Sequence, residues 1–142
     1  MRCPNARPTT PCTRSKLGEL ASTACIAKAA VLDAAEAIAA ATASEIAAVP
    51  DARLAAVPDA RLAAEAQLAV AKVKVHLDDV PPEAATRLLG LGGASAESRQ
   101  RNLDRHWRNI RTIMLHNPVA HNARVIGQNL LHGTPVPADA YF

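Results

Sequence analysis

The sequence of 142 residues is long enough for one domain with a single hydrophobic core. Apolar residues make up 49% of the chain but aromatic residues only 2%, so the core has to consist of alanine, valine, leucine and isoleucine, which favours packed helices over a sheet. The net charge of +3 is spread along the chain and does not by itself indicate a nucleic-acid-binding protein.

The three cysteines, Cys3, Cys12 and Cys25, include no CxxC pair and are odd in number. A disulfide framework or a zinc site is therefore not expected. The first residues contain no apolar run typical of a signal peptide, and the alanine-rich region that follows carries too many charges for a membrane span. We therefore expect a cytoplasmic protein.

A long first helix is predicted after a proline- and threonine-rich lead-in at residues 1–14. Ser15 is suited to cap this helix. Apolar and alanine residues then recur at steps of three and four as far as Ala41, which is the pattern of a helical core stripe. Pro50 should end the helix at about Val49.

The sequence VPDARLAA occurs at residues 49–56 and again at residues 57–64. Two short copies do not make a repeat fold, so we interpret them as a local duplication in the connection between helices. The second copy leads into a helix expected over residues 59–79. The proline pair at 81–82 should then break or sharply kink the helix, because proline lacks an N–H and clashes with the preceding turn.

Three further helices complete the expected fold. A short one is predicted over residues 83–91, ended by Gly92 and Gly93, and a longer one over residues 98–115. Asn117 and Pro118 should start the last helix, which Gly133 ends after His132, with residues 134–142 as a tail. The predicted fold is thus all-α, an up-and-down four-helix bundle over residues 15–133.

The segment DRHWRNIRTIMLHNPV, residues 104–119, is the part of the sequence richest in reactive side chains. At 100° per residue, a helix here separates an apolar side from a basic face. The apolar side holds Leu103, Trp107, Ile110 and Met114, and the basic face holds Arg101, Arg105, Arg108, Thr112 and, at its end, His116. Trp107 is therefore interpreted as a core residue rather than as a stacking platform.

The basic face allows two interpretations. One is a solvated helix surface, and the other is an anion site, because guanidinium groups match phosphate and carboxylate oxygens. His116 directly precedes the predicted start of a helix, where negative charge is favoured. The other histidines are weaker candidates, and no pair of them has metal-ligand spacing.

Residues 88–137, LLGLGGASAESRQRNLDRHWRNIRTIMLHNPVAHNARVIGQNLLHGTPVP, resemble the C-terminal helical domain of the acyl-CoA dehydrogenase superfamily. The closer match is the flavin-dependent monooxygenase branch, which includes dibenzothiophene monooxygenase and sulfur-acquisition oxidoreductases. LDRHWRNIRT with the following HNP is the specific part, and the alanine-rich helices before it fit more loosely. No counterpart of the catalytic carboxylate of true dehydrogenases is evident, which favours monooxygenase chemistry.

The resemblance implies a partial flavin site. In that family FMN or FAD lies between a β-domain and C-terminal bundles, including one from a neighbouring subunit of an oligomer. Gly92 and Gly93 would approach the flavin phosphate through their backbone, and His116 would face the reactive edge of the isoalloxazine. Arg105 and Arg108 belong to the same signature and would hold the flavin phosphate or fix the bundle.

Three functions follow from these expectations. The first is a fragment of a flavin-dependent oxidoreductase that is inactive alone, because the N-terminal and β-domains are absent from this sequence. The second is a split subunit that a separately encoded partner completes. The third, from a different class, is a small helical interaction or nucleic-acid-binding module that uses the face formed by Arg101, Arg105 and Arg108.

Overall fold

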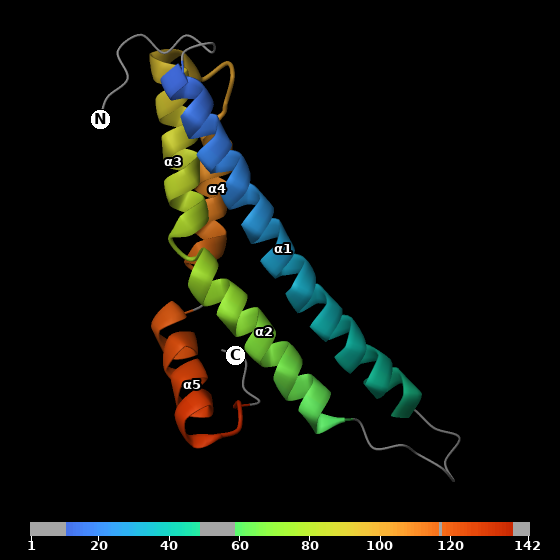
Figure 1. Ribbon diagram of the computed structural model, residues 1–142. Helices are drawn as coiled ribbons and strands as arrows, with labels where there is room; N and C mark the ends of the chain where they lie inside the picture. Colours follow the sequence, from blue (N-terminus) through green and yellow to red (C-terminus); the bar gives the residue numbers. More distant parts are fainter. Residues whose placement is uncertain (1–10, 49–58, 117, 138–142) are drawn as a thin grey trace. The chain divides into compact units, whose positions relative to one another are not determined.

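The computed structural model of the chain describes residues 11–48, 59–116 and 118–137. These residues form five α-helices and one 3₁₀ helix and contain no strand, so the all-α prediction is confirmed for them. The elements are α1 (Pro11–Ala48), α2 (Ala60–Leu77), α3 (Val80–Gly92), η1 (Gly93–Glu97), α4 (Asp104–Met114) and α5 (Val119–His132) (Figure 1).

The chain divides into two compact units, and α1 belongs to both. The first unit comprises Met1–Ala27 and Leu77–Asn117, and therefore contains the first part of α1 with α3, η1 and α4. The second unit comprises Lys28–His76 and Pro118–Phe142, and therefore contains the rest of α1 with α2 and α5.

Helix α1 begins four residues earlier than expected. Pro11 is its first residue, and proline is tolerated there because the N–H groups of the first turn have no acceptor within the helix. Ser15 lies inside the helix, so the prediction that Ser15 caps it is wrong. The end at Ala48 agrees with a stop before Pro50.

Helix α2 starts in the second copy of the duplicated sequence, as predicted. The side chain of Asp59 accepts a hydrogen bond of 2.9 Å from the backbone N–H of Arg61 and so caps the helix. The backbone N–H of Asp59 donates to Ser44 Oγ on α1 at 2.9 Å. The first copy, at residues 49–56, lies outside the described residues.

The proline pair begins a helix instead of preceding one. A turn at Asp78 and Asp79 separates α2 from α3, and α3 contains both prolines in its first turn. The N–H of Glu83 donates to the carbonyl oxygen of Asp79 at 3.1 Å, so the hydrogen bonding is helical from the start. The predicted break is present, but the predicted helix start at Glu83 is three residues late.

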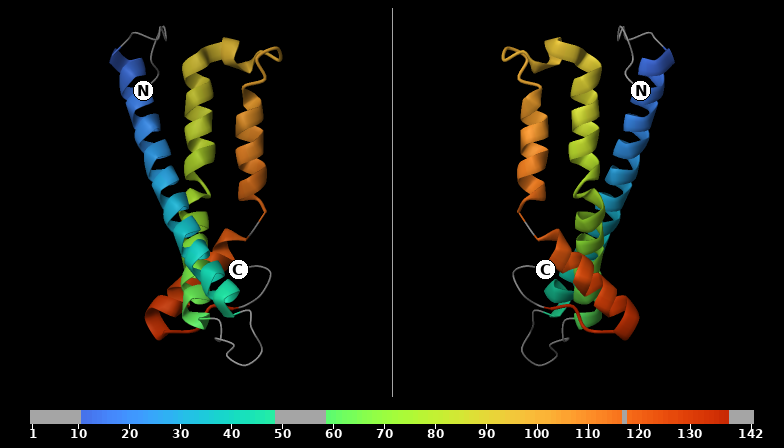
Figure 2. Two further views of the ribbon diagram at one scale, coloured as in Figure 1. Left: turned by 90° about the vertical axis from the view of Figure 1, so that its right-hand side faces the viewer. Right: turned by 90° about the vertical axis from the view of Figure 1, so that its left-hand side faces the viewer.

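In the first unit, α3 and α4 lie side by side and run antiparallel, with the first part of α1 beside α3 (Figure 2). The predicted helix over residues 98–115 begins only at Asp104. Ser98 accepts backbone hydrogen bonds from Arg101 and Asn102, and Asn102 has a φ of +46°. A left-handed residue interrupts a right-handed helix, so residues 98–103 form a turn instead.

Helix α5 ends at His132 as predicted, because Gly133 adopts a φ of +63° and donates its N–H to Asn129 O at 2.9 Å. At its start, Pro118 occupies the N-cap position and Val119 is the first helical residue. Asn117, the predicted cap, lies outside the described residues.

Five of the seven buried apolar residues in the described ranges are alanines, as the composition predicts. In the second unit the buried apolar residues are Ala34, Ala41, Ala66, Ala71 and Val125, and in the first unit Leu77 and Ala96. Larger apolar side chains of α1 remain exposed, among them Ile26, Ile38 and Ile46. None of the described helices is long and apolar enough to cross a membrane.

The cysteines differ from expectation at one position. Cys25 on α1 is a free, exposed thiol. Cys12 is disulfide-bonded, which the expectation of no disulfide framework did not anticipate.

Candidate functional site

Gly92 and Gly93 lie where α3 passes into η1. Gly92 has a helical φ of −78°, and a Cβ built on it would lie 2.6 Å from the Cβ of Ala96. Gly93 has a φ of +59° and a ψ of −160°, a combination that L side chains avoid. A Cβ on Gly93 would meet no atom within 4 Å, so its backbone is open to approach. Both glycines therefore have a local structural reason for being glycine.

The two signature arginines have different surroundings. Arg108 forms an ion pair with Asp104 one helical turn earlier, and its Nη2 donates to Asn102 Oδ1 at 3.2 Å. Arg105 is exposed and its Nε donates to His106 Nε2 at 3.4 Å, which is a long hydrogen bond. Asp104 therefore balances the charge of Arg108, whereas no ion pair to Arg105 is found in the described part of the chain.

His116 lies beyond the opposite end of α4. Its side chain is exposed, and its backbone N–H donates to Ile113 O at 3.2 Å. Since a helix rises about 1.5 Å per residue, the helical residues from Arg105 to Met114 alone span about 14 Å. The structure thus groups Gly92, Gly93 and Arg105 at one end of the α3–α4 pair and leaves His116 at the other.

The apolar side of α4 packs as the sequence predicts, but only in part. Ile110 and Met114 are half-buried, whereas Leu103 is 41% and Trp107 36% exposed. The indole N–H of Trp107 donates to Thr86 Oγ1 on α3 at 3.0 Å, and that hydroxyl donates to Pro82 O at 2.8 Å. Trp107 is thus attached to α3 through its polar edge and is only partly a core residue.

A groove of about 400 Å³, called here the leucine groove, lies between the first part of α1, α3, η1 and α4. Its lining also includes Thr13, Gly92, Ala96 and His106. A second hollow of about 260 Å³ lies next to it and shares Ala85, Leu88 and His106 with it. The large apolar side chains of the leucine groove are Leu17, Leu88, Leu89, Leu91, Leu103 and Trp107.

His106 was not singled out from the sequence, although it is the histidine that lines both hollows. The signal was available, because Leu103, His106, Trp107 and Ile110 recur at steps of three, one and three, which places them on one side of a helix. A histidine among apolar residues on one side of a helix therefore indicates a polar group in the apolar surface that α4 contributes to the hollows.

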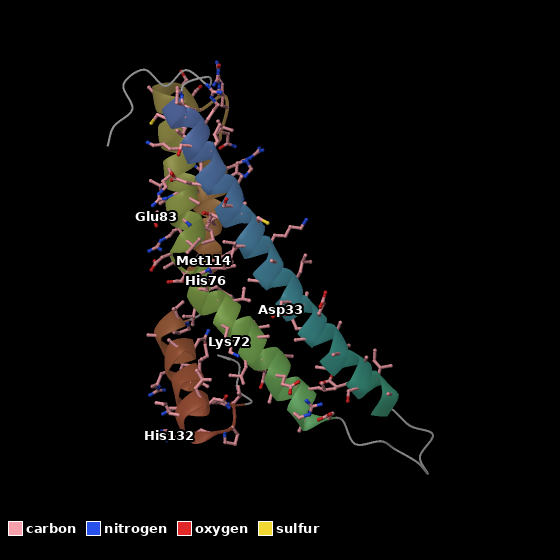
Figure 3. All side chains as sticks on the ribbon, viewed as in Figure 1. Asp33, Lys72, His76, Glu83, Met114 and His132 are labelled. Atoms are coloured by element: carbon pink, nitrogen blue, oxygen red, sulfur yellow. The ribbon has the colours of Figure 1, made fainter. Side chains whose placement is uncertain are left out.

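The second unit contains a groove of mixed charge, about 410 Å³ in volume. Asp33 on α1 and Lys72 and His76 on α2 line it (Figure 3), as does Glu65. Its charged lining thus consists of two carboxylates and one ammonium group, with His76 beside them. In the described ranges no three His, Cys, Asp or Glu side chains are arranged to hold a metal ion.

The remaining histidines contribute no further site. His132 is exposed in the last turn of α5. His121 is half-buried, and its Nδ1 lies 3.3 Å from Arg124 Nη2. Beside it, Asn122 is 2% exposed.

The basic face proposed for an interaction module is not continuous. Arg101 lies in the turn before α4 and therefore does not extend the helical row of Arg105 and Arg108. The charge of Arg108 is balanced by Asp104. A nucleic-acid-binding helix needs several uncompensated cations along one face, and this face has fewer than predicted.

The groups on α3 and α4 are of the kind that a flavin requires. The open backbone at Gly93 and the exposed guanidinium of Arg105 suit a phosphate, and the exposed imidazole of His116 can donate or accept a hydrogen bond. Arg108 fits less well, because a phosphate there would have to compete with Asp104.

Comparison with known proteins gives a consistent result. Residues 10–121 match the family described as acyl-CoA dehydrogenase, C-terminal domain. The chain is 35% identical over 72 residues to a probable FMNH2-dependent monooxygenase, SfnC, of Pseudomonas putida, which covers 50% of this chain and 18% of that protein. The crystal structure of TdsC from Paenibacillus sp. A11-2 with FMN and indole matches with a TM-score of 0.71 and 26% identity, over 94% of this chain and 31% of TdsC.

The chain therefore spans less than a third of the length of either relative. The family match includes α1 through α4 and the beginning of α5, and thus both glycines, both arginines and His116. The resemblance seen in the sequence is confirmed. The chain belongs to the family of acyl-CoA dehydrogenase C-terminal domains, in the branch that includes flavin-dependent monooxygenases.

Proposed function

We propose that this chain is the C-terminal helical part of an FMN-dependent monooxygenase and supplies part of its flavin site and of its oligomer interface. The main support is the match over residues 10–121, combined with two relatives whose names or bound ligands specify FMN. FMN is thereby favoured over FAD. The N-terminal and β-domains would come from a partner subunit or from a longer chain, in the cytoplasm.

Bound FMN would supply the redox chemistry, and the residues of this chain would bind and orient it. The backbone of Gly92 and Gly93 and the guanidinium of Arg105 would hold the phosphate, because all three lie at one end of the α3–α4 pair. Arg108 would act mainly by fixing the turn before α4, since it contacts both Asp104 and Asn102. His116 would donate a hydrogen bond at the reactive edge of the flavin ring.

The exposed apolar side chains of α1 support the proposed oligomer interface. Ile26 is 61% and Ile46 68% exposed, which is unusual for side chains of this size. Contact with another subunit would remove them from water, at about 25 cal/mol for each Å² of apolar surface buried.

The test uses a chimera in which this chain replaces the matching C-terminal part of the P. putida relative. The measurements are FMN retention, product formation and hydrogen peroxide release. His116→Ala should leave FMN retention unchanged but divert oxygen from product to hydrogen peroxide. The loss of one positioned hydrogen-bond donor at a reacting centre commonly costs about 3 kcal/mol, or roughly a hundredfold in rate.

His132→Ala is the matched control, because His132 is exposed at the far end of α5. His121 is less suitable, since it is half-buried and contacts Arg124. Equal coupling of oxygen use to product in the His116→Ala chimera and its parent would remove His116 from the mechanism. A folded chimera that retains no FMN would contradict the proposed function itself.

The isolated chain should bind FMN weakly. The proposed groups lie on exposed helix ends and a turn. Without the other domains they could cover only one side of the flavin ring, and the other side would remain in water. Purified chain with stoichiometric flavin would contradict this expectation.

A further inference from the structure

The apolar lining of the leucine groove is not used by the proposed flavin chemistry; of the groups assigned there to the flavin phosphate, Gly92 lines the groove and Arg105 lies beside it. Leu88 is 56% and Leu103 41% exposed, although both line the groove. Large apolar side chains that surround a hollow and remain in water indicate a surface that is covered when a ligand binds.

The dimensions of the groove fit a small molecule. Its volume of about 400 Å³ falls within the range of about 300–1,000 Å³ that is usual for ligand sites. The second hollow lies on the other side of Leu88, where its lining includes Leu20 on α1 and Pro81 on α3. Because the two hollows adjoin at Ala85, Leu88 and His106 and their walls are mainly aliphatic, the lining suits an alkyl chain better than a broad polar ring system.

One cationic side chain, Arg105, lies beside the groove and donates a hydrogen bond to His106 in its wall. His106 lines both hollows, and the Arg105 guanidinium lies against it, with 3.4 Å between Nε and Nε2. Arg61, Arg87 and Arg108 form ion pairs with carboxylates one turn away, whereas no such pair is found for Arg105 in the described ranges. The edge of the groove thus holds an uncompensated cation.

We propose that the leucine groove binds single-chain anionic amphiphiles, with the alkyl chain against Leu88 and Trp107 and the carboxylate or sulfonate at Arg105 and His106. The occupant is a free monomeric amphiphile rather than a membrane surface. The proposal does not depend on the proposed function, because the isolated chain without flavin contains every group involved.

Trp107 is the sole tryptophan of the chain and lines the groove, so its fluorescence reports on occupancy. The chain is titrated with decanesulfonate below its critical micelle concentration. We expect a saturable change in Trp107 emission and an unchanged helix content by circular dichroism. Octanesulfonate should bind about sixteenfold more weakly, because it has two methylenes fewer and each buried methylene contributes about fourfold in affinity.

Charge selectivity is tested with decanol and decyltrimethylammonium, which should bind more weakly than decanesulfonate. Arg105→Gln should weaken decanesulfonate binding about three- to fivefold and leave decanol binding unchanged. Arg111→Gln is the matched control, since Arg111 is an exposed arginine on the same helix that lines neither hollow.

The apolar wall is tested with Leu88→Gln, which should abolish the chain-length dependence. Ile113→Gln is its control, because Ile113 is 63% exposed on α4 and lines neither hollow. The proposal is overturned by any of four results: no saturable response, equal binding of the anionic and neutral amphiphiles, loss of helix on titration, or a response to anionic vesicles alone.

Discussion

The junction between α3 and η1 offers a test in which one substitution should have opposite effects in two backgrounds. Gly92 has helical backbone angles, so replacement by alanine should by itself stabilise the helix by about 1 kcal/mol. The new Cβ, however, would lie 2.6 Å from the Cβ of Ala96, which is 4% exposed and has little room to move. Overpacking of this kind costs about 1–3 kcal/mol.

We therefore expect Gly92→Ala to lower the free energy of unfolding by about 1 kcal/mol and the melting temperature by about 4 °C. In an Ala96→Gly background the clash is absent, so the same substitution should instead stabilise the chain by about 1 kcal/mol. The assay is urea unfolding followed by Trp107 emission, since Trp107 shares the leucine groove with Gly92 and Ala96. Stabilisation by Gly92→Ala in both backgrounds would refute the close contact.

Three further predictions concern the helices around the site. Thr86→Val removes the hydroxyl that links Trp107 to Pro82, so it should lower the free energy of unfolding by about 0.5–1 kcal/mol and change Trp107 emission. Thr112→Val is the control: it loses only a hydrogen bond within its own helix and should leave the emission unchanged. Pro81→Ala with Pro82→Ala should destabilise the chain by about 1–2 kcal/mol in chemical unfolding, because both prolines start a native helix and restrict the unfolded chain; a gain in stability would mean that they interrupt a longer helix. Deletion of residues 57–64 removes the start of α2, but the identical first copy can take its place. The melting temperature should therefore stay within about 2 °C of the parent, since a shorter connection saves only about 0.6 kcal/mol per halving; a large drop would show that the two copies are not interchangeable.

The helices could be predicted because their signals are local. Alanine content, apolar steps of three and four, and the glycines at 92–93 and 133 are enough to place most helix ends within a few residues. The start of α4 was missed because Asn102 adopts a left-handed conformation that its sequence neighbours do not reveal. Ser15 was wrongly predicted as a cap because proline and serine both mark helix starts, and Pro11 comes first.

The site was less predictable because it depends on contacts between helices. The projection at 100° per residue placed Arg101, Arg105 and Arg108 on one face because it assumed a helix that starts at residue 98. The helix starts at Asp104. The pairing of Arg108 with Asp104 follows the common i to i+4 spacing and could have been predicted. The spacing of His106 with Leu103 and Ile110 indicates its side of α4, whereas the two hollows that it lines depend on how α1 and α3 pack against α4.

The backbone angles at Gly93 limit which side chains position 93 can tolerate. Gly133 adopts the left-handed helical region, with a φ of 63° and a ψ of 20°, where asparagine is also tolerated. Gly93 combines a φ of 59° with a ψ of −160°. These angles are close to the mirror image of the polyproline conformation of L residues. Besides glycine, only a residue of opposite chirality adopts these backbone angles without strain. A D-alanine introduced by chemical synthesis should therefore be tolerated at position 93, whereas L-alanine should not. No codon specifies such a residue, so every coded substitution at position 93 should cost about 1–3 kcal/mol of stability for a reason of handedness rather than of space.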